Sequence, residues 1–169
     1  MVPFNILTLI AAGAPAPSIL VLQPVEDQLS PGKSRVVPIY IGFLEAVNLG
    51  AALEHARFER PNTHDLMLDA LTSLDATIDH VLINDVRGNT FYARLTLSQH
   101  GRLIDLDARP SDAIALAVRE GADLFIEEEV LDRASYPYLY KEPLDQDKAL
   151  DDFKSFLENL SPEDFESLG

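Results

Sequence analysis

The sequence predicts an α+β domain in which helices pack on two antiparallel β-meanders. Short β-rich runs occur in two groups of three, at residues 4–10, 19–23 and 35–41, then at residues 77–86, 90–97 and 102–108. Short turns containing Gly separate the last three runs, which is typical of hairpins. Stretches with apolar residues at helical spacing follow each group. The alternation of these two patterns predicts the α+β class.

The size and charge of the chain limit both its organisation and its function. At 169 residues and 47% hydrophobic content, the chain can form one well-packed domain plus an appendage. We expect the domain to span residues 1–135, and residues 136–169 to form a linker and an acidic amphipathic C-terminal helix. The net charge of −15 argues against binding of nucleic acid by a broad basic face, so any polyanion must be bound locally.

The chain contains no cysteine, which excludes disulfides, thiolate metal sites and a cysteine nucleophile. This composition favours a cytoplasmic protein. An apolar run at residues 4–10 precedes Ala12-Gly13-Ala14, but no Lys or Arg comes before it. We therefore expect a strand and a turn there rather than a secretory signal. No run approaches the roughly 20 apolar residues of a membrane helix, so no membrane partner is expected.

Two helices are expected between the meanders. Residues 44–55 carry a helical mix of apolar residues that Gly50 weakens, and a charged loop at residues 57–62 follows. The next helix begins at Thr63, a good N-cap, with Asp65 in the first turn, where the helix dipole favours a carboxylate. Its predicted buried stripe consists of Met67, Ala70, Leu71 and Leu74.

The last strand of the second meander runs directly into a helix. Apolar and polar residues alternate over 104–109, which predicts a strand with one buried face. Pro110 suits the first turn of a helix, where Ser111 or Asp112 can accept a free backbone N–H, and Gly121 ends the helix as a left-handed cap. Four polar groups are therefore expected at one corner: Asp107, Arg109, Ser111 and Asp112.

The remaining chain is expected to be less regular. A short strand at residues 123–126 and a short acidic helix at residues 127–134 follow the junction. Residues 135–143, rich in Tyr, Pro and Lys, are typical of a linker or of a strip on the surface. Beyond them an amphipathic helix is predicted, with an apolar face made of Ala149, Phe153, Phe156, Leu157 and Leu160.

Residues 39–53 and 104–118 are similar to each other. In both, a strand end and its turn are followed by an acid, an alanine and a β-branched residue, as in Glu45-Ala46-Val47 and Asp112-Ala113-Ile114. This similarity indicates an internal duplication of a strand-then-helix unit. Glu45 and Asp112 would then occupy equivalent first turns and could face each other across a pseudo-two-fold cleft.

Four motifs in this order and spacing resemble those of the bifunctional nuclease domain family. They are PIYIG at residues 38–42 with Glu45-Ala46, THDL at 63–66, TFYARL at 90–95 and DARPSDAIALA at 107–117. The resemblance covers about residues 4–135. It implies a compact α+β domain, dimers, and a nuclease that cuts both DNA and RNA.

Hydrolysis of phosphodiester bonds commonly uses a divalent metal on carboxylates, with a cation or a histidine near the scissile group. We therefore expect Glu45, Asp107 and Asp112 to hold a divalent metal, Mg²⁺ or Mn²⁺. The residues that we expect to be catalytic are His64, Asp65, Arg109 and Ser111. The residues that we expect to bind the substrate are Arg94 and Arg109.

Each of these residues also has a structural explanation. The acids at helix starts satisfy free N–H groups, and Ser111 does the same as a cap. His64 can lie on the surface in a capping turn, Arg109 can pair with Asp107 to lock the strand end, and Arg94 can be a solvated strand residue. In this alternative, the protein is a non-catalytic dimeric module that binds a protein or a small ligand.

Overall fold

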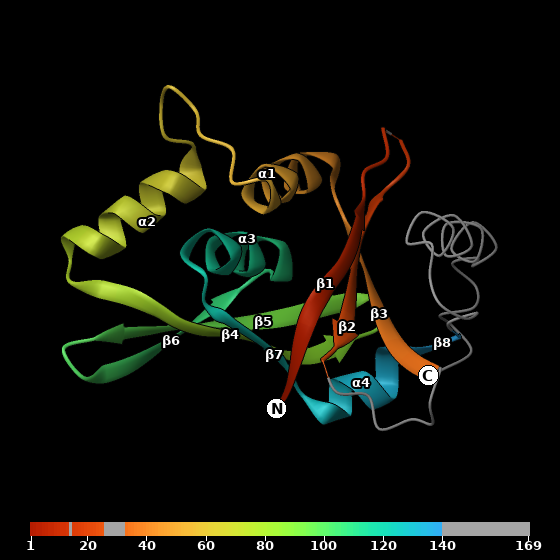
Figure 1. Ribbon diagram of the computed structural model, residues 1–169. Helices are drawn as coiled ribbons and strands as arrows, with labels where there is room; N and C mark the ends of the chain where they lie inside the picture. Colours follow the sequence, from red (N-terminus) through yellow and green to blue (C-terminus); the bar gives the residue numbers. More distant parts are fainter. Residues whose placement is uncertain (14, 26–32, 140–169) are drawn as a thin grey trace.

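The computed structural model describes residues 1–13, 15–25 and 33–139 (Figure 1). The elements in chain order are β1 (Val2–Ile10), β2 (Ser18–Pro24), β3 (Lys33–Ile41), α1 (Phe43–Leu53), α2 (Thr63–Ser73), β4 (Ala76–Arg87), β5 (Thr90–Gln99), β6 (Arg102–Ala108), α3 (Pro110–Glu120), β7 (Asp123–Ile126), α4 (Glu128–Ala134) and β8 (Tyr136–Leu139).

The strands of the described part form one eight-stranded sheet in the order β6-β5-β4-β7-β1-β2-β3-β8. Two antiparallel meanders, β1-β2-β3 and β4-β5-β6, make up most of it. Strand β7 joins them, because it pairs antiparallel with β1 and parallel with β4. The predicted α+β class with two meanders is confirmed.

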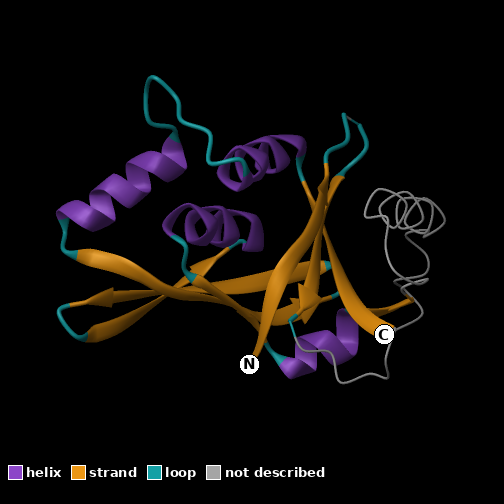
Figure 2. Cartoon of the chain, viewed as in Figure 1, coloured by secondary structure: helices purple, strands orange, loops and turns teal. Residues whose placement is uncertain are grey.

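Helices α1, α2 and α3 lie together on one side of the sheet, and α3 is the central one (Figures 1 and 2). It contacts α1, α2, β4, β5 and β7, whereas α4 packs against β4 and β3. The sequence favours this helix at both ends: Pro110 occupies its first position, and Gly121 adopts φ 78° at its end, as predicted. Small residues such as Ala113 and Ala117 are fully buried, which lets neighbours approach closely.

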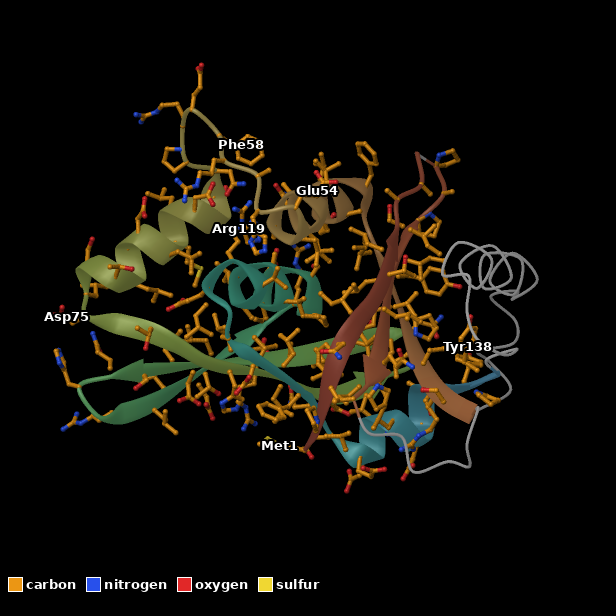
Figure 3. All side chains as sticks on the ribbon, in the orientation of Figure 1. Met1, Glu54, Phe58, Asp75, Arg119 and Tyr138 are labelled. Carbon is orange, nitrogen blue, oxygen red and sulfur yellow. The ribbon has the colours of Figure 1, made fainter. Side chains whose placement is uncertain are left out.

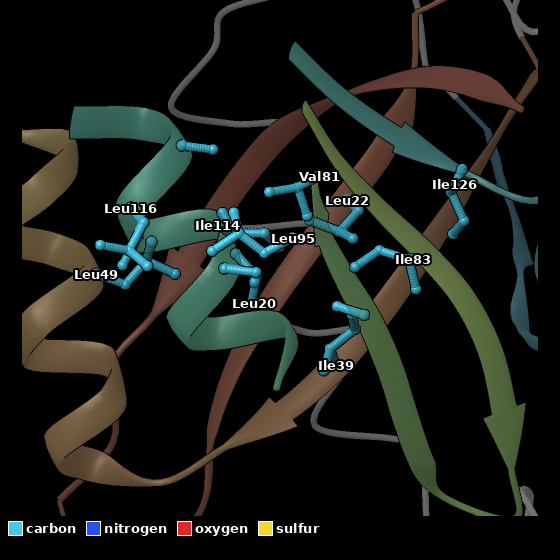
Figure 4. Close-up of a cluster of buried hydrophobic side chains, with 14 of the residues drawn as sticks. Leu20, Leu22, Ile39, Leu49, Val81, Ile83, Leu95, Ile114, Leu116 and Ile126 are labelled. Carbon is cyan, nitrogen blue, oxygen red and sulfur yellow. The ribbon is translucent and has the colours of Figure 1, made fainter. Parts of the chain in front are cut away.

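One hydrophobic cluster fixes the position of α1 and α3 over the sheet (Figure 4). Leu49 of α1 and Ile114 of α3 are fully buried, and they pack in a cluster with strand residues that include Leu20, Ile83 and Leu95. Burial of one such side chain contributes about 1.5–3 kcal/mol. The starts of α1 and α3 are therefore held at defined places above the sheet.

Strand β6 has the predicted bounds but not the predicted burial. Its residues 102–107 are all exposed, including Ile104 and Leu106, at 39% and 38%. The expectation of a buried face is wrong because β6 lies at the edge of the sheet, next to β5 alone. Alternation of residue types shows which residues share a face, but it does not show whether that face is covered.

Helix α2 begins where expected but is capped by a different residue. Asn62 is the N-cap, and its side chain accepts from the backbone N–H of Asp65, whereas Thr63 is the first helical residue. The predicted stripe is also partly wrong, because Ala70 and Leu74 are exposed. The residues that face the core are Met67, Leu68 and Leu71. Helix α2 lies at the margin of the fold, and its principal contacts are with α3 and β4, so its buried stripe is narrow.

Residues 136–139, which we expect in a linker, instead form β8 and pair with β3. Tertiary packing explains this difference, because Tyr136 and Tyr138 pack against the buried Val21 and Val36 on one face of the sheet. The predicted helix around residues 149–160 lies outside the described residues. Within the described residues, no helix is both long and apolar enough to cross a bilayer.

Candidate functional site

The candidate site lies where α1 and α3 begin. Gly42 precedes α1 and Arg109 precedes α3, both in extended conformation, and neither start has a side-chain capping bond. Glu45 and Asp112 each lie in the first turn, three residues after the N-cap. The two strand-then-helix units thus place equivalent acids at the starts of two helices that contact each other.

Arg109 lies between these two acids. Its Nε and Nη2 donate to the two carboxylate oxygens of Asp112 over 2.7 and 3.1 Å, and Nη1 donates to Oε1 of Glu45 over 2.8 Å. Asp112 and then Glu45 raise the pKa of the Arg109 guanidinium above its ordinary value, so it stays charged at any relevant pH. The sequence predicts that the side chain of Ser111 or Asp112 accepts a hydrogen bond from a free backbone N–H at the start of α3. No such capping bond is present, and the carboxylate of Asp112 accepts from Arg109 instead.

Gly42 leaves room for the carboxylate of Glu45. A Cβ at position 42 would meet Oε2 of Glu45, whose other oxygen is bonded to Arg109. The backbone of Gly42 has φ −70°, which any residue adopts. Glycine therefore allows the close approach of the flexible Glu45 side chain, and no special backbone conformation calls for it.

His64 of α2 extends this cluster. Its Nε2 lies 3.5 Å from Oδ1 of Asp112, and its side chain is 13% exposed. We call the four residues Glu45, Arg109, Asp112 and His64 the polar corner. They come from α1, α2 and the junction of β6 with α3, so the fold brings together side chains that are distant in the sequence.

Asp65 stabilises the start of α2 and does not join the polar corner. Its carboxylate accepts from the backbone N–H of Asn62 over 3.1 Å, which completes a capping box. The same carboxylate forms an ion pair with Nη1 of Arg119 over 2.8 Å. The explanation of Asp65 as a helix-start residue thus has direct geometric support.

Arg119 is a residue whose role the sequence did not indicate. It follows Asp112 by two helical turns on α3, its side chain is only 9% exposed, and it lies where α2 approaches α3 (Figure 3). The pairs Arg119–Asp65 and Asp112–His64 together hold α2 along α3, which presents His64 to the corner. The sequence alone predicts only that an arginine in the last turn of a helix interacts favourably with the helix dipole.

A pocket of about 260 Å³ opens beside the polar corner. Gly42, Glu45, Arg109, Pro110 and Ser111 line one side of it. The strand residues that line it are Ile39, Tyr40 and Ile41 of β3, Thr90 and Phe91 of β5, and the neighbouring Asn89. Because β4, β7, β1 and β2 separate β5 from β3 in the sheet, the sheet must curl to bring these two strand ends to one pocket.

Asp107 and Arg94 lie apart from the polar corner. Ala108 packs against the core, so its neighbour Asp107 points to the other face of β6. Arg94 stands opposite Asp107 in register and forms an ion pair with Asp105 over 3.4 Å. The alternative pair of Arg109 with Asp107 is not made either, because Arg109 pairs with Asp112 and Glu45.

The arrangement does not fit the predicted three-ligand metal centre. Among residues 1–13, 15–25 and 33–139, no group of three or more His, Cys, Asp or Glu side chains is placed to hold a metal ion. Glu45 and Asp112 are bonded to Arg109, and Asp107 faces away. The corner can instead offer a guanidinium, an imidazole and two helix starts to an anion.

Comparison with known proteins agrees with the motifs. Residues 28–138 match the bifunctional nuclease domain family. An uncharacterized protein of Mycobacterium tuberculosis is 34% identical over 152 residues, which cover 86% of this chain and 90% of that protein. Bifunctional nuclease 1 of Oryza sativa subsp. indica is 29% identical over 107 residues, or 62% of this chain and 31% of that protein.

Bifunctional nuclease 2 of Oryza sativa subsp. japonica is 30% identical over 113 residues, which cover 65% of this chain and 33% of that protein. The chain thus spans about a third of the length of these plant relatives and most of the length of the mycobacterial one. The matched region includes the polar corner, the pocket and every strand of both meanders except β1 and β2. On the strength of this match and of the four motifs, the chain belongs to the bifunctional nuclease domain family.

Proposed function

We propose that the protein is a nuclease that hydrolyses phosphodiester bonds of DNA and RNA at the polar corner. The observation that supports this best is Arg109, held between Glu45 and Asp112 beside an open pocket. Three of its five N–H groups donate to the two acids. The other two can donate to phosphate oxygens, for which the planar guanidinium is well shaped.

The starts of α1 and α3 support the same phosphate position. Neither helix start has a side-chain cap, so first-turn N–H groups of both are available to an anion, and both dipoles favour negative charge there. Ser111 lines the pocket between these elements, and we propose that its hydroxyl contacts the bound phosphate. The two carboxylates more than offset the charge of Arg109, so binding of a phosphate at this site alone should be weak.

His64 is proposed as the acid or base. The carboxylate of Asp112 lies 3.5 Å from its Nε2 and faces the imidazole, so it can orient the ring. In the proposed reaction a water oxygen attacks phosphorus, the bond from phosphorus to the leaving sugar oxygen breaks, and that oxygen takes up a proton. His64 can remove the proton from the attacking water or deliver one to the leaving oxygen, and solvent water exchanges the other proton. Dependence on Mg²⁺ or Mn²⁺ stays a prediction, which cleavage with and without a chelator tests.

The test is cleavage of single-stranded RNA and DNA by purified protein, with Arg109→Met and His64→Gln as variants. Loss of a positioned charge or of an acid–base group typically costs about 10²–10³-fold in rate, so both variants should lose that much kcat/KM. Arg102→Met is the matched control, because Arg102 is exposed at the opposite end of β6. Circular dichroism must show that the fold is retained.

The second candidate is a non-catalytic module in which the corner is a structural lock. The observation that favours it is that Arg109 ties the start of α1 to the start of α3 through two ion pairs. If the wild-type protein leaves both nucleic acids intact and Asp112→Ala mainly lowers Tm, this candidate replaces the nuclease. A dimeric state, a cytoplasmic location and a role of Arg94 in substrate binding stay predictions from the sequence.

A further inference from the structure

We infer that the pocket beside the polar corner binds one unpaired nucleotide, with its base between the ends of β3 and β5 and its phosphate on Arg109. The substrates are then single strands or the unpaired parts of folded nucleic acids. This inference rests on the proposed function, because it names the substrate class of the same site. It follows from the shape of the pocket, from the side chains that line it and from the charge of the molecule.

The pocket is small and partly aromatic. Its volume of about 260 Å³ lies just below the roughly 300–1,000 Å³ of typical ligand pockets, which suits one nucleotide and not a base pair. Tyr40, 40% exposed, and the half-buried Phe91 are the two aromatic residues among those that line it. A base can reach rings in such a pocket only after it leaves the stack and its pairing partner.

The remaining lining residues complement the polar edge of a base. Asn89 follows Gly88, whose φ of 56° makes the tight turn between β4 and β5, and Asn89 and Thr90 border the pocket. An amide and a hydroxyl both donate and accept hydrogen bonds, so they can serve several bases. Burial raises the pKa of the Tyr40 phenol, so this ring brings no negative charge near the phosphate.

The net charge of the chain also favours single strands over duplexes as substrates. With a net charge of −15, the protein lacks the basic excess that duplex binding through many phosphates requires. Affinity must then come from a few local contacts. Stacking of bases on aromatic side chains is the sequence-tolerant contact that serves this purpose for single strands.

The test is equilibrium binding, measured by fluorescence anisotropy. The probe is a fluorescein-labelled oligodeoxythymidylate of about 12 nucleotides, a length within the ~4–16-nucleotide range of single-strand sites, with phosphorothioate linkages to slow hydrolysis. The same oligonucleotide annealed to its complement is the duplex probe. The variants are Tyr40→Leu and Phe91→Leu, which keep apolar bulk and remove the ring, and Phe58→Leu is the control, because Phe58 is exposed outside the pocket.

The wild type should bind the single strand more tightly than the duplex. Each ring variant should weaken single-strand binding by about 5- to 150-fold, which corresponds to about 1–3 kcal/mol per stacked base, and Phe58→Leu should leave it unchanged. Equal binding of both probes, with no effect of Tyr40→Leu, would overturn the inference and leave the proposed hydrolysis standing. Competition by thymidine 5′-monophosphate at the same nucleotide concentration would overturn it in favour of a free nucleotide.

Failure of the proposed hydrolysis would give a different experimental result. If the wild type binds the single strand through Tyr40 but cleaves neither RNA nor DNA, the proposed hydrolysis fails and the nucleotide site is supported. The two conclusions are therefore separated by one binding and one cleavage measurement on the same preparation.

Discussion

Gly42 and Arg109 occupy equivalent positions, each directly before the first residue of a helix that starts at the site. Their contributions to the polar corner differ. Gly42 contributes empty space, into which Glu45 folds back, and Arg109 contributes the cation that Glu45 and Asp112 both contact. The geometry of the polar corner thus depends both on the absence of a side chain at Gly42 and on the guanidinium of Arg109.

Gly42→Ala should therefore disturb the corner without unfolding the protein. The added methyl group must displace the carboxylate of Glu45, so Arg109 loses one of its two acidic partners. We expect kcat/KM on single-stranded RNA to fall by about tenfold. This factor corresponds to about 1.4 kcal/mol, near the lower end of the free energy that a hydrogen bond to a charged group contributes. The control is Gly50→Ala, where the Cβ would stand at an ordinary 3.7 Å from Leu9.

Gly50→Ala should leave activity unchanged and stabilise α1 by about 0.5–1 kcal/mol, because alanine is the better helix former. An equal effect of the two variants on kcat/KM would contradict the proposed role of Gly42.

Part of the geometry of the candidate site could be predicted from the sequence. The clustering of Arg109 with Ser111 and Asp112 follows from their closeness in the chain. The place of Asp107 did not follow, because it depends on which face of β6 packs on the core. Tyr40 and Phe91 were missed because no local pattern shows that the ends of β3 and β5 meet.

The start of α2 determines where His64 lies. The helix begins after Asn62, whose side chain and backbone form a capping box with Asp65. Arg119 then holds Asp65 from α3. His64 therefore reaches Asp112 from a helix end that is fixed by neighbouring contacts on both sides.

Asn62→Ala should lower the free energy of unfolding by about 1 kcal/mol, the usual cost of losing an N-cap side chain. Thr63→Ala is the matched control and should have little effect, because Thr63 is inside the helix. Urea unfolding followed by circular dichroism measures both. The reverse order of effects would restore Thr63 as the cap, as its residue type alone suggests.

Most elements were predictable because their patterns are local. The bounds of β6, β7 and α3 agree with the residue patterns to within a residue or two, as do those of the other helices and strands up to residue 134. The exposure of β6 and the existence of β8 were not predictable. Both depend on the order of strands in the sheet, and strand order is set by long-range pairing.

A polar network outside the site connects β4 to α4. Arg133 of α4 bonds to Asp85 over 2.9 Å, and Arg87 bonds to the same carboxylate over 2.8 Å. These bonds, that from Arg133 first, hold the pKa of the Asp85 carboxyl below its ordinary value of 3.8. A carboxyl with a lowered pKa in the folded state stabilises the fold above its unfolded pKa and loses that contribution as the pH falls.

Asp85→Asn should accordingly destabilise the protein at pH 7, and the difference from the wild type should shrink as the pH falls below about 4. Chemical unfolding at several pH values measures this difference. Asp69→Asn serves as the control, because Asp69 is exposed on α2 and has no ion pair among the described residues. A difference that grows toward acid pH would contradict the assignment.

The unequal residues at the two helix starts have a consequence for polarity. A site with true two-fold symmetry would accept a nucleic-acid strand in either direction. Here one half carries both a cation and an acid, Arg109 and Asp112, and the other half carries the acid Glu45 alone, so the proposed substrate strand would meet different chemistry at each end. The proposed site therefore predicts that a bound strand is held in only one of its two 5′-to-3′ directions.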